Sequence, residues 1–213
     1  MSFHKKNLKS QLLIFSIDII SKEGVDKLTM RYLAQKLEVS QNALYRHYAS
    51  KNELLFEVIS LAYKDLTSHF ALALQNQTGN STDQFISIAK AYVFFAIKNP
   101  SVFKLMFSQE IQKGKLRTNF NKEVMQCYQY LLTTLEIGQQ KGEISNHYDI
   151  NNIANLCWSL VHGIANLLID NQIDIVNHNS PLPNPENHLQ NIDEKKIETY
   201  LDNILQVFLT GIE

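Results

Sequence analysis

Apolar residues recur at helical spacing along nearly the whole chain, and no stretch alternates convincingly with the two-residue period of a β-strand. This pattern predicts an all-α protein of about nine helices without a sheet. We expect residues 171–192, which hold three of the four prolines, to form a polar loop. The predicted helices cover residues 8–24, a short stretch after 29, and 40–48, then 51–74, 82–98, 102–110, 120–142, 149–168 and 193–212.

Residues 29–48 predict a helix-turn-helix, because two short helices are joined by a tight turn and followed by a long helix. Thr29 and Ser40 can cap the two short helices, and Ser50 with Glu53 forms a capping box for the long one. Apolar residues on the inner faces should hold the two short helices together. They are Met30, Leu33, Ala34, Leu37, Val39 and Leu44.

The polar side chains left on the outer face suit the major groove of DNA. Gln41 and Asn42 can each bond an adenine edge. Ala43 can touch a thymine methyl group, and Arg46 can reach guanine or phosphate. We expect further side chains to contact phosphate oxygens. These are Thr29, Arg31, Tyr45, His47 and Lys51. A helical hairpin that has a polar face but does not bind DNA would give the same pattern.

The charge of the chain is unevenly distributed, although the net charge is only −1. Residues 1–51 hold nine Lys/Arg and four Asp/Glu, which gives 9 − 4 = +5. The remainder holds eleven Lys/Arg and seventeen Asp/Glu, which gives 11 − 17 = −6. A basic head on an acidic body is typical of a phosphate-binding module joined to a module that does not bind DNA.

The stretch Leu8–Ile59, above all TMRYLAQKLEVSQNALYRHYASKNELL, closely resembles the DNA-binding domain of tetracycline-repressor (TetR) family regulators. The resemblance covers about the first quarter of the chain. It implies a three-helix DNA-binding domain over residues 1–50, joined by a long fourth helix to a helical effector-binding and dimerisation domain over 51–213. Most members have glycine in the turn where this chain has Glu38, and a left-handed backbone there costs another residue roughly 1–2 kcal/mol.

A second, shorter resemblance lies in the body of the chain. The segment 158–163, WSLVHG, with the sequences NP at 99–100 and LMF at 105–107, is similar to the subgroup named for its Trp-His-Gly signature. Packing in the protein core would also account for the presence of these residues. We expect a pocket for a small apolar effector in this body. Its predicted lining is Phe95, Phe103, Met106, Phe107, Tyr128, Leu131, Trp158 and His162.

The last two predicted helices indicate a homodimer. The final helix has a broad apolar stripe, and the helix before it is apolar nearly all round. A single copy would therefore leave an apolar face of these helices exposed to solvent. A two-fold dimer would bind a pseudo-palindromic double-stranded operator. The predicted interface residues are Ile164, Leu168, Ile197, Leu201, Leu205 and Phe208.

Several other classes of protein find no support in the sequence. The seven histidines lack metal-ligand spacing, the seven glycines form no phosphate loop, and no serine lies in a Gly-x-Ser-x-Gly motif. We therefore expect no metal, no cofactor and no enzymatic activity. The two cysteines, Cys127 and Cys157, lie in apolar helical patterns and predict free thiols in a reducing cytosol.

The pattern also predicts a cytoplasmic protein without a membrane partner, because no segment approaches the ~18 consecutive apolar residues of a membrane span. The function predicted is that of a sequence-specific transcriptional repressor that a small apolar ligand releases from its operator. One alternative is a DNA-bound factor of the same fold that recruits a protein partner and senses no ligand. Another is a helical protein that has lost DNA binding.

Overall fold

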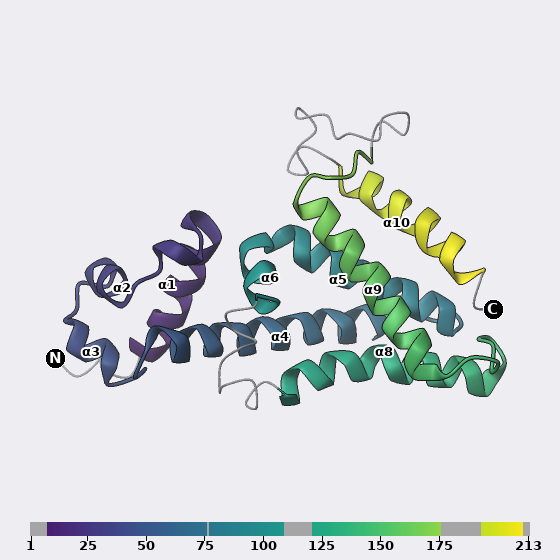
Figure 1. Ribbon diagram of the computed structural model, residues 1–213, viewed down its shortest axis with the longest axis horizontal. Helices are drawn as coiled ribbons and strands as arrows, with labels where there is room; N and C mark the ends of the chain where they lie inside the picture. The colour runs from purple at the N-terminus through teal and green to yellow at the C-terminus, as the bar shows by residue number, and fades with distance from the viewer. Residues whose placement is uncertain (1–7, 76, 109–120, 176–192, 211–213) are drawn as a thin grey trace. The chain divides into compact units, whose positions relative to one another are not determined.

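The computed structural model describes residues 8–75, 77–108, 121–175 and 193–210, and these residues form helices and no strand. The predicted all-α class is therefore confirmed. Figure 1 shows the helices in chain order. They are α1 (Leu8–Glu23), the short 3-10 helix η1 (Val25–Lys27), α2 (Met30–Lys36), α3 (Gln41–Tyr45), α4 (Lys51–Gln75), α5 (Ser81–Lys98), α6 (Pro100–Met106), α8 (Asn121–Lys141), α9 (Ile150–Ile169) and α10 (Glu194–Leu209).

The helix starts lie where the sequence has capping residues. The side chain of Asp149 accepts hydrogen bonds from the N–H groups of Asn151 and Asn152 in α9, and Asp193 accepts one from the N–H of Lys195 in α10. Ser50 Oγ accepts from the N–H of Glu53 at 3.2 Å, as a capping box requires. The return bond is shifted by one residue, because Glu53 accepts from the N–H of Ala49.

Four predicted helix boundaries differ from the structure by two or more residues. α3 ends at Tyr45, not near residue 48, because the N–H groups of His47 and Tyr48 both turn back to the carbonyl of Leu44. α6 begins at Pro100, two residues earlier than predicted, since proline needs no hydrogen-bonded N–H in the first turn. η1 was not predicted. α6 ends at Met106 and α10 ends at Leu209, earlier than the predicted ends near 110 and 212. The predicted loop beyond residue 175 and the predicted helix start at 120 lie outside the described residues.

Packing divides the chain into two compact units. The first unit holds Met1–Asp65 with Asn99–Val124, and the second holds Leu66–Lys98 with Met125–Glu213. This division follows packing and differs from the predicted functional boundary after residue 50, which stays a prediction.

In the first unit, α1 packs against η1, α2 and α6, and α2 packs against α3. The centre of this unit consists of aliphatic side chains that are almost completely buried. Burial of such side chains contributes about 1.5–3 kcal/mol each and holds the short helices in place. They include Leu12, Ile20, Leu33, Leu44 and Leu54.

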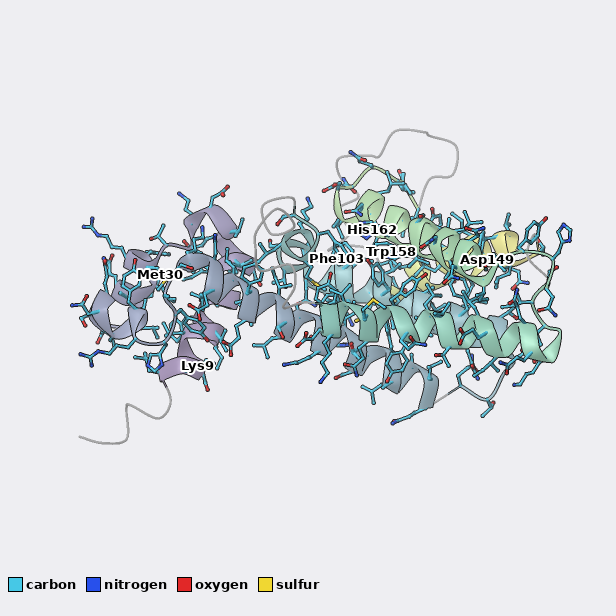
Figure 2. The ribbon with its side chains drawn as sticks, turned by 60° about the horizontal axis from the view of Figure 1, so that its bottom comes forward. Lys9, Met30, Phe103, Asp149, Trp158 and His162 are labelled. Atoms are coloured by element: carbon cyan, nitrogen blue, oxygen red, sulfur yellow. The ribbon has the colours of Figure 1, made fainter. Side chains whose placement is uncertain are left out.

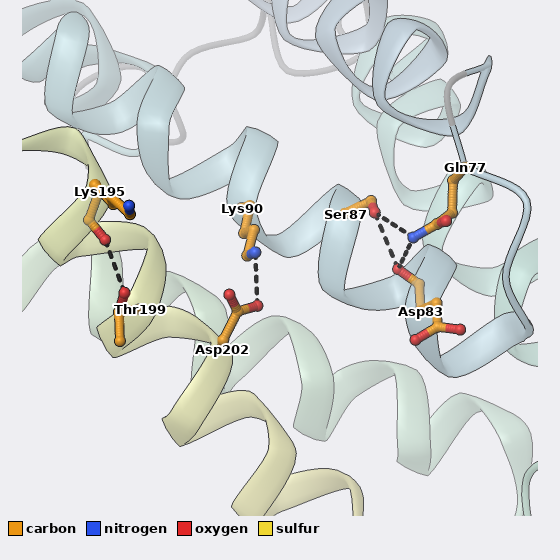
Figure 3. Close-up of polar contacts among 7 residues, drawn as sticks. All are labelled: Gln77, Asp83, Ser87, Lys90, Lys195, Thr199 and Asp202. Carbon is orange, nitrogen blue, oxygen red and sulfur yellow. Dashed lines mark hydrogen bonds and ion pairs between the residues drawn. The ribbon is translucent and has the colours of Figure 1, made fainter.

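In the second unit, α5 packs against both α9 and α10. Two ion pairs join α5 to α10: Lys90 Nζ lies 2.6 Å from Asp202, and Lys98 Nζ lies 3.1 Å from Glu194. Figure 3 shows the Lys90–Asp202 pair. The figure also shows how the start of α5 is tied to the segment before it, where the Gln77 amide donates to the Asp83 carbonyl at 3.2 Å.

Helix α9 is long and apolar enough to cross a membrane by length and composition, which the sequence analysis did not anticipate. The core helix of a soluble protein passes the same test. Residues on one side of α9, among them Ala154, Cys157 and Leu168, are completely buried in the second unit. Packing against α5 therefore accounts for the apolar character of that side.

Candidate nucleic-acid interface

The turn between α2 and α3 has the geometry of a helix-turn-helix. Thr29 Oγ1 accepts from the N–H of Tyr32 at 3.1 Å and caps α2, and Ser40 Oγ accepts from the N–H of Ala43 at 3.3 Å and caps α3. Between the two helices, Glu38 has a φ of 54°, in the left-handed region. The turn thus keeps a conformation that favours glycine, although the residue is glutamate.

The inner and outer faces of α3 separate as the sequence predicts. Leu44 is completely buried, whereas Gln41, Asn42 and Arg46 are exposed. Tyr45 is 48% exposed, which is high for an aromatic side chain in a folded domain. Thr29 and Arg31 at the start of α2 are also exposed, and Ala43, His47 and Lys51 are half-buried. The polar groups that suit base edges therefore lie together on one accessible helix face.

The basic side chains of this unit differ in what they bind within the protein. Lys22 pairs with Asp18 at 2.7 Å, and Lys9 pairs with Glu57 at 2.9 Å. The ammonium group of Lys51 donates to the carbonyl of Val25 at 3.1 Å and so ties the start of α4 to η1. The sequence analysis assigned Lys51 only to phosphate and missed this bond, which joins residues 26 positions apart.

The contact between α1 and α2 is also polar. The hydroxyl of Tyr32 donates to the carboxylate of Glu23, with oxygen–oxygen distances of 2.9 and 3.0 Å. Lys36 Nζ lies 3.8 Å from the same carboxylate and 5.2 Å from the centroid of the Tyr32 ring. The hydrogen bond to Tyr32 raises the pKa of Lys36. This cluster fixes α2 against the C-terminal end of α1.

The predicted ligand-pocket residues are divided between the two units. Phe103, Met106 and Phe107 belong to the first unit, and the other predicted residues, Phe95, Tyr128, Leu131, Trp158 and His162, belong to the second. Figure 2 labels Phe103, Trp158 and His162. The structure brings Phe103 and Phe107 together at 5.0 Å between ring centroids, and Trp158 and His162 at 6.1 Å.

A polar pair that the sequence analysis did not single out lies within the aromatic side chains of the second unit. The hydroxyl of Tyr92 is 2.8 Å from Nδ1 of His162. Phe70 stacks on Tyr92 at 6.5 Å between centroids and meets Tyr130 edge-on at 6.1 Å. Burial lowers the pKa of His162 below its usual 6.5, which favours the neutral imidazole.

Most of the predicted dimer-interface residues lie in the core of the single chain, which corrects that assignment. Five of the six are at most 4% exposed, since α5 covers them; they are Ile164, Leu168, Ile197, Leu201 and Leu205. Phe208 is half-buried and lies 6.3 Å from Phe85, between ring centroids.

The apolar side chains that remain accessible on these helices are different ones. Leu156 is 54% exposed and Leu167 is 39% exposed on α9, and Val207 on α10 is 75% exposed. Leu160 and Gly163, both half-buried, continue the row of Leu156 and Leu167 at helical spacing. A Cβ atom added at Gly163 would meet nothing within 4 Å, so packing inside the chain does not require glycine there.

Two family profiles match the chain. The profile described as "Bacterial regulatory proteins, tetR family" matches residues 16–58, and the one described as "Tetracyclin repressor-like, C-terminal domain" matches residues 85–181. The chain belongs to the TetR family. The TetR-family chain is a DNA-binding transcriptional regulator of the helix-turn-helix kind. The Trp-His-Gly resemblance is not tested by these matches and stays a prediction.

Curated relatives of this TetR-family regulator include the nucleoid occlusion factor SlmA of Yersinia pseudotuberculosis. It is 28% identical over 134 residues, which cover 60% of this chain and 67% of that protein. SlmA of Edwardsiella ictaluri is likewise 28% identical over 134 residues, with the same coverage.

Solved structures with the same fold share little sequence with the regulator. A protein of unknown function from Rhodococcus sp. RHA1 has a TM-score of 0.79 at 21% identity and covers 100% of this chain and 98% of its own. FadR from Bacillus subtilis, solved in complex with stearoyl-CoA, has a TM-score of 0.72 at 13% identity, covering 96% and 99%. The ketosteroid transcriptional regulator KstR2 of Mycobacterium tuberculosis has a TM-score of 0.62 at 15% identity, covering 96% and 94%.

Proposed function

We propose that this regulator is a cytoplasmic homodimer that represses its target genes, and that a small, largely apolar ligand bound in the second unit releases it from the operator. The exposed face of α3 is the observation that carries the DNA-binding part of the proposal. Gln41 and Asn42 read base edges, and Arg31, Arg46 and Tyr45 hold phosphates and position the helix.

The dimer part of the proposal rests on the accessible apolar row of α9. Leu156, Leu160, Gly163 and Leu167 share one face, and the glycine lets a second helix approach closely. Val207 extends the apolar surface onto α10. A two-fold dimer through α9 and α10 would read a pseudo-palindrome with half-sites about one helical turn apart.

The ligand part of the proposal rests on the polar pair inside the aromatic cluster of the second unit. Binding sites for apolar ligands combine an aromatic lining with a few polar groups that fix orientation, and Tyr92 with His162 provides such a pair. Trp158, 44% exposed and next to His162, could close over a ligand. The FadR structure with stearoyl-CoA gives a precedent for an acyl ligand in this fold.

The experiment begins with duplexes selected on the purified full-length chain from a random library. Fluorescence anisotropy then measures affinity for the enriched sequence and for random duplex, without and with stearoyl-CoA, palmitate or a steroid at saturation. We expect one of these probes to raise the melting temperature of the protein and to weaken operator binding about 5–150-fold. A probe that raises the melting temperature and leaves operator affinity unchanged would contradict the release mechanism.

The similarity to SlmA favours a second candidate function. That relative is named a nucleoid occlusion factor. The second candidate is a DNA-bound factor that recruits a protein partner and senses no small-molecule inducer. The two functions are distinguished by reporter expression from the selected operator. Under the first proposal, deletion of the regulator raises expression from a promoter that contains the operator. Under the second, deletion leaves expression from that promoter unchanged.

A further inference from the structure

Tyr48 connects the recognition helix to the rest of the first unit. It lies three residues beyond the end of α3 and is only 1% exposed. Its backbone N–H donates to the carbonyl of Leu44 at 3.0 Å, and Leu44 is the completely buried residue of α3. Because Ser40 caps the other end of α3, the position of Tyr48 determines where the C-terminal end of this short helix lies.

Lys9 of α1 lies over the Tyr48 ring and pairs with Glu57 of α4. Lys9 Nζ of α1 lies 5.6 Å from the ring centroid, within range of a cation–π interaction. The same ammonium group forms an ion pair with Glu57 of α4 at 2.9 Å. Burial raises the pKa of the Tyr48 phenol, and the nearby Glu57 carboxylate raises it further. Figure 2 labels Lys9 on α1.

We propose that Lys9 and Glu57 are positioning residues, which set the recognition helix α3 for base reading by holding Tyr48 between α1 and α4. This inference rests on DNA reading by α3, the function proposed above. It assigns Lys9 to the support of Tyr48, although a lysine in a basic DNA-binding head would ordinarily be assigned to phosphate.

The pair is expected to affect base reading more than overall DNA affinity. Lys9 and Glu57 are 53% and 37% exposed, and an exposed ion pair alone changes an equilibrium only about two- to five-fold. Base reading depends on the exact direction of the Gln41 and Asn42 side chains, whereas phosphate attraction tolerates a small tilt of α3. A shift of Tyr48 therefore weakens operator binding while random duplex binds as before.

The test is a charge swap with a matched control on the same helix. The variants are Lys9→Glu, Glu57→Lys and the double exchange, each measured on selected operator and on random duplex over a range of salt. The control exchanges Lys22 and Asp18, a pair at 2.7 Å that lies within α1. We expect each single change at Lys9 or Glu57 to lower the ratio of operator to random affinity about two- to five-fold. The double exchange should restore most of this ratio, and the control exchange should leave it unchanged.

The outcomes separate positioning from direct contact. If Lys9→Glu weakened both duplexes equally, reduced the salt slope and was not rescued by Glu57→Lys, Lys9 would be a phosphate contact and the proposal would be wrong. If charge reversal prevents folding, Lys9→Met and Glu57→Gln provide the same comparison without adding charge. A wild-type chain that does not distinguish operator from random duplex would overturn the proposed DNA reading, and the positioning role with it.

Discussion

The Tyr92 hydroxyl of α5 and Nδ1 of His162 on α9 lie 2.8 Å apart, so the two helices share a hydrogen bond within the second unit. The rings of the two residues are also in edge contact, with centroids 6.2 Å apart. Burial lowers the pKa of His162 and so disfavours the imidazolium form in the folded protein. Acid should therefore weaken this part of the molecule.

The His162→Asn variant should remove part of the acid sensitivity of folding. Below about pH 6.5 His162 becomes protonated in the unfolded chain but stays largely neutral in the folded chain. The unfolded state therefore binds more protons, and the free energy of unfolding falls as the pH falls. Above pH 6.5 this contribution is fully present. Urea unfolding at pH 7.5, 6.5 and 5.5 should show a smaller decrease in the free energy of unfolding with falling pH for His162→Asn than for wild type. The other histidines are common to both proteins, so equal losses would contradict the assignment.

The Glu38→Gly variant should be more stable than wild type. Glutamate at a φ of 54° carries a steric cost of about 1–2 kcal/mol, which glycine avoids at an entropic cost of about 0.5–1 kcal/mol. We expect a net gain of about 0.5–1 kcal/mol in the free energy of urea unfolding. Glu38→Ala keeps the Cβ atom and serves as the control, with little change expected. A loss of stability in Glu38→Gly would mean that the glutamate side chain itself stabilises the turn.

The Gln41→Ala and Arg31→Ala variants should weaken DNA binding in different ways. Gln41→Ala should lose roughly 1–3 kcal/mol of binding free energy on operator and almost none on random duplex, and its salt slope should equal that of wild type. Arg31→Ala should weaken both duplexes and flatten the plot of log affinity against log salt by about one unit. A salt titration by anisotropy measures both. Equal losses on both duplexes with equal slopes would refute the division into base readers and phosphate contacts.

The Lys51→Ala variant should show two effects. Loss of the bond to the Val25 carbonyl, 3.1 Å long, should lower the free energy of unfolding by about 0.5–1.5 kcal/mol. If the ammonium group also meets phosphate, the salt slope of DNA binding falls by about one unit as well. Lys27→Ala, which alters an exposed lysine of η1, is a control for the loss of one positive charge. A variant as stable as wild type would show that the Val25 bond contributes nothing.

The Leu156→Asp variant should give a folded monomer. Leu156 is 54% exposed in the single chain, so a carboxylate there disturbs only a surface that a second copy covers. Leu201→Asp provides the contrast, because Leu201 is completely buried and its replacement should leave the chain insoluble. Analytical ultracentrifugation at micromolar concentration measures the state of each protein. A Leu156→Asp protein that remains dimeric would exclude this face of α9 from the interface.

The sequence by itself determined the starts of the capped helices and the exposed face of α3. Thr29 and Ser40 cap the helices that they were predicted to cap, and Asp149 and Asp193 cap helices at the starts of the ranges predicted from 149 and 193. A capping bond joins residues two or three positions apart, so local sequence is enough to predict it. The inner and outer faces of α3 also follow from local order, since a short amphipathic helix has only one side that can be buried.

Only the tertiary structure decided which apolar residues are core and which cations are engaged. α9 is apolar on more than one side, so its sequence could not indicate that α5 covers Ile164 and Leu168 while Leu156 and Leu167 remain accessible. The bonds of Lys9 and Lys51 join residues 48 and 26 positions apart, in different helices or turns. A periodic pattern indicates the direction of a side chain around its own helix. The residue that this side chain contacts depends on where another helix lies, and the packing of the whole unit sets the position of that helix.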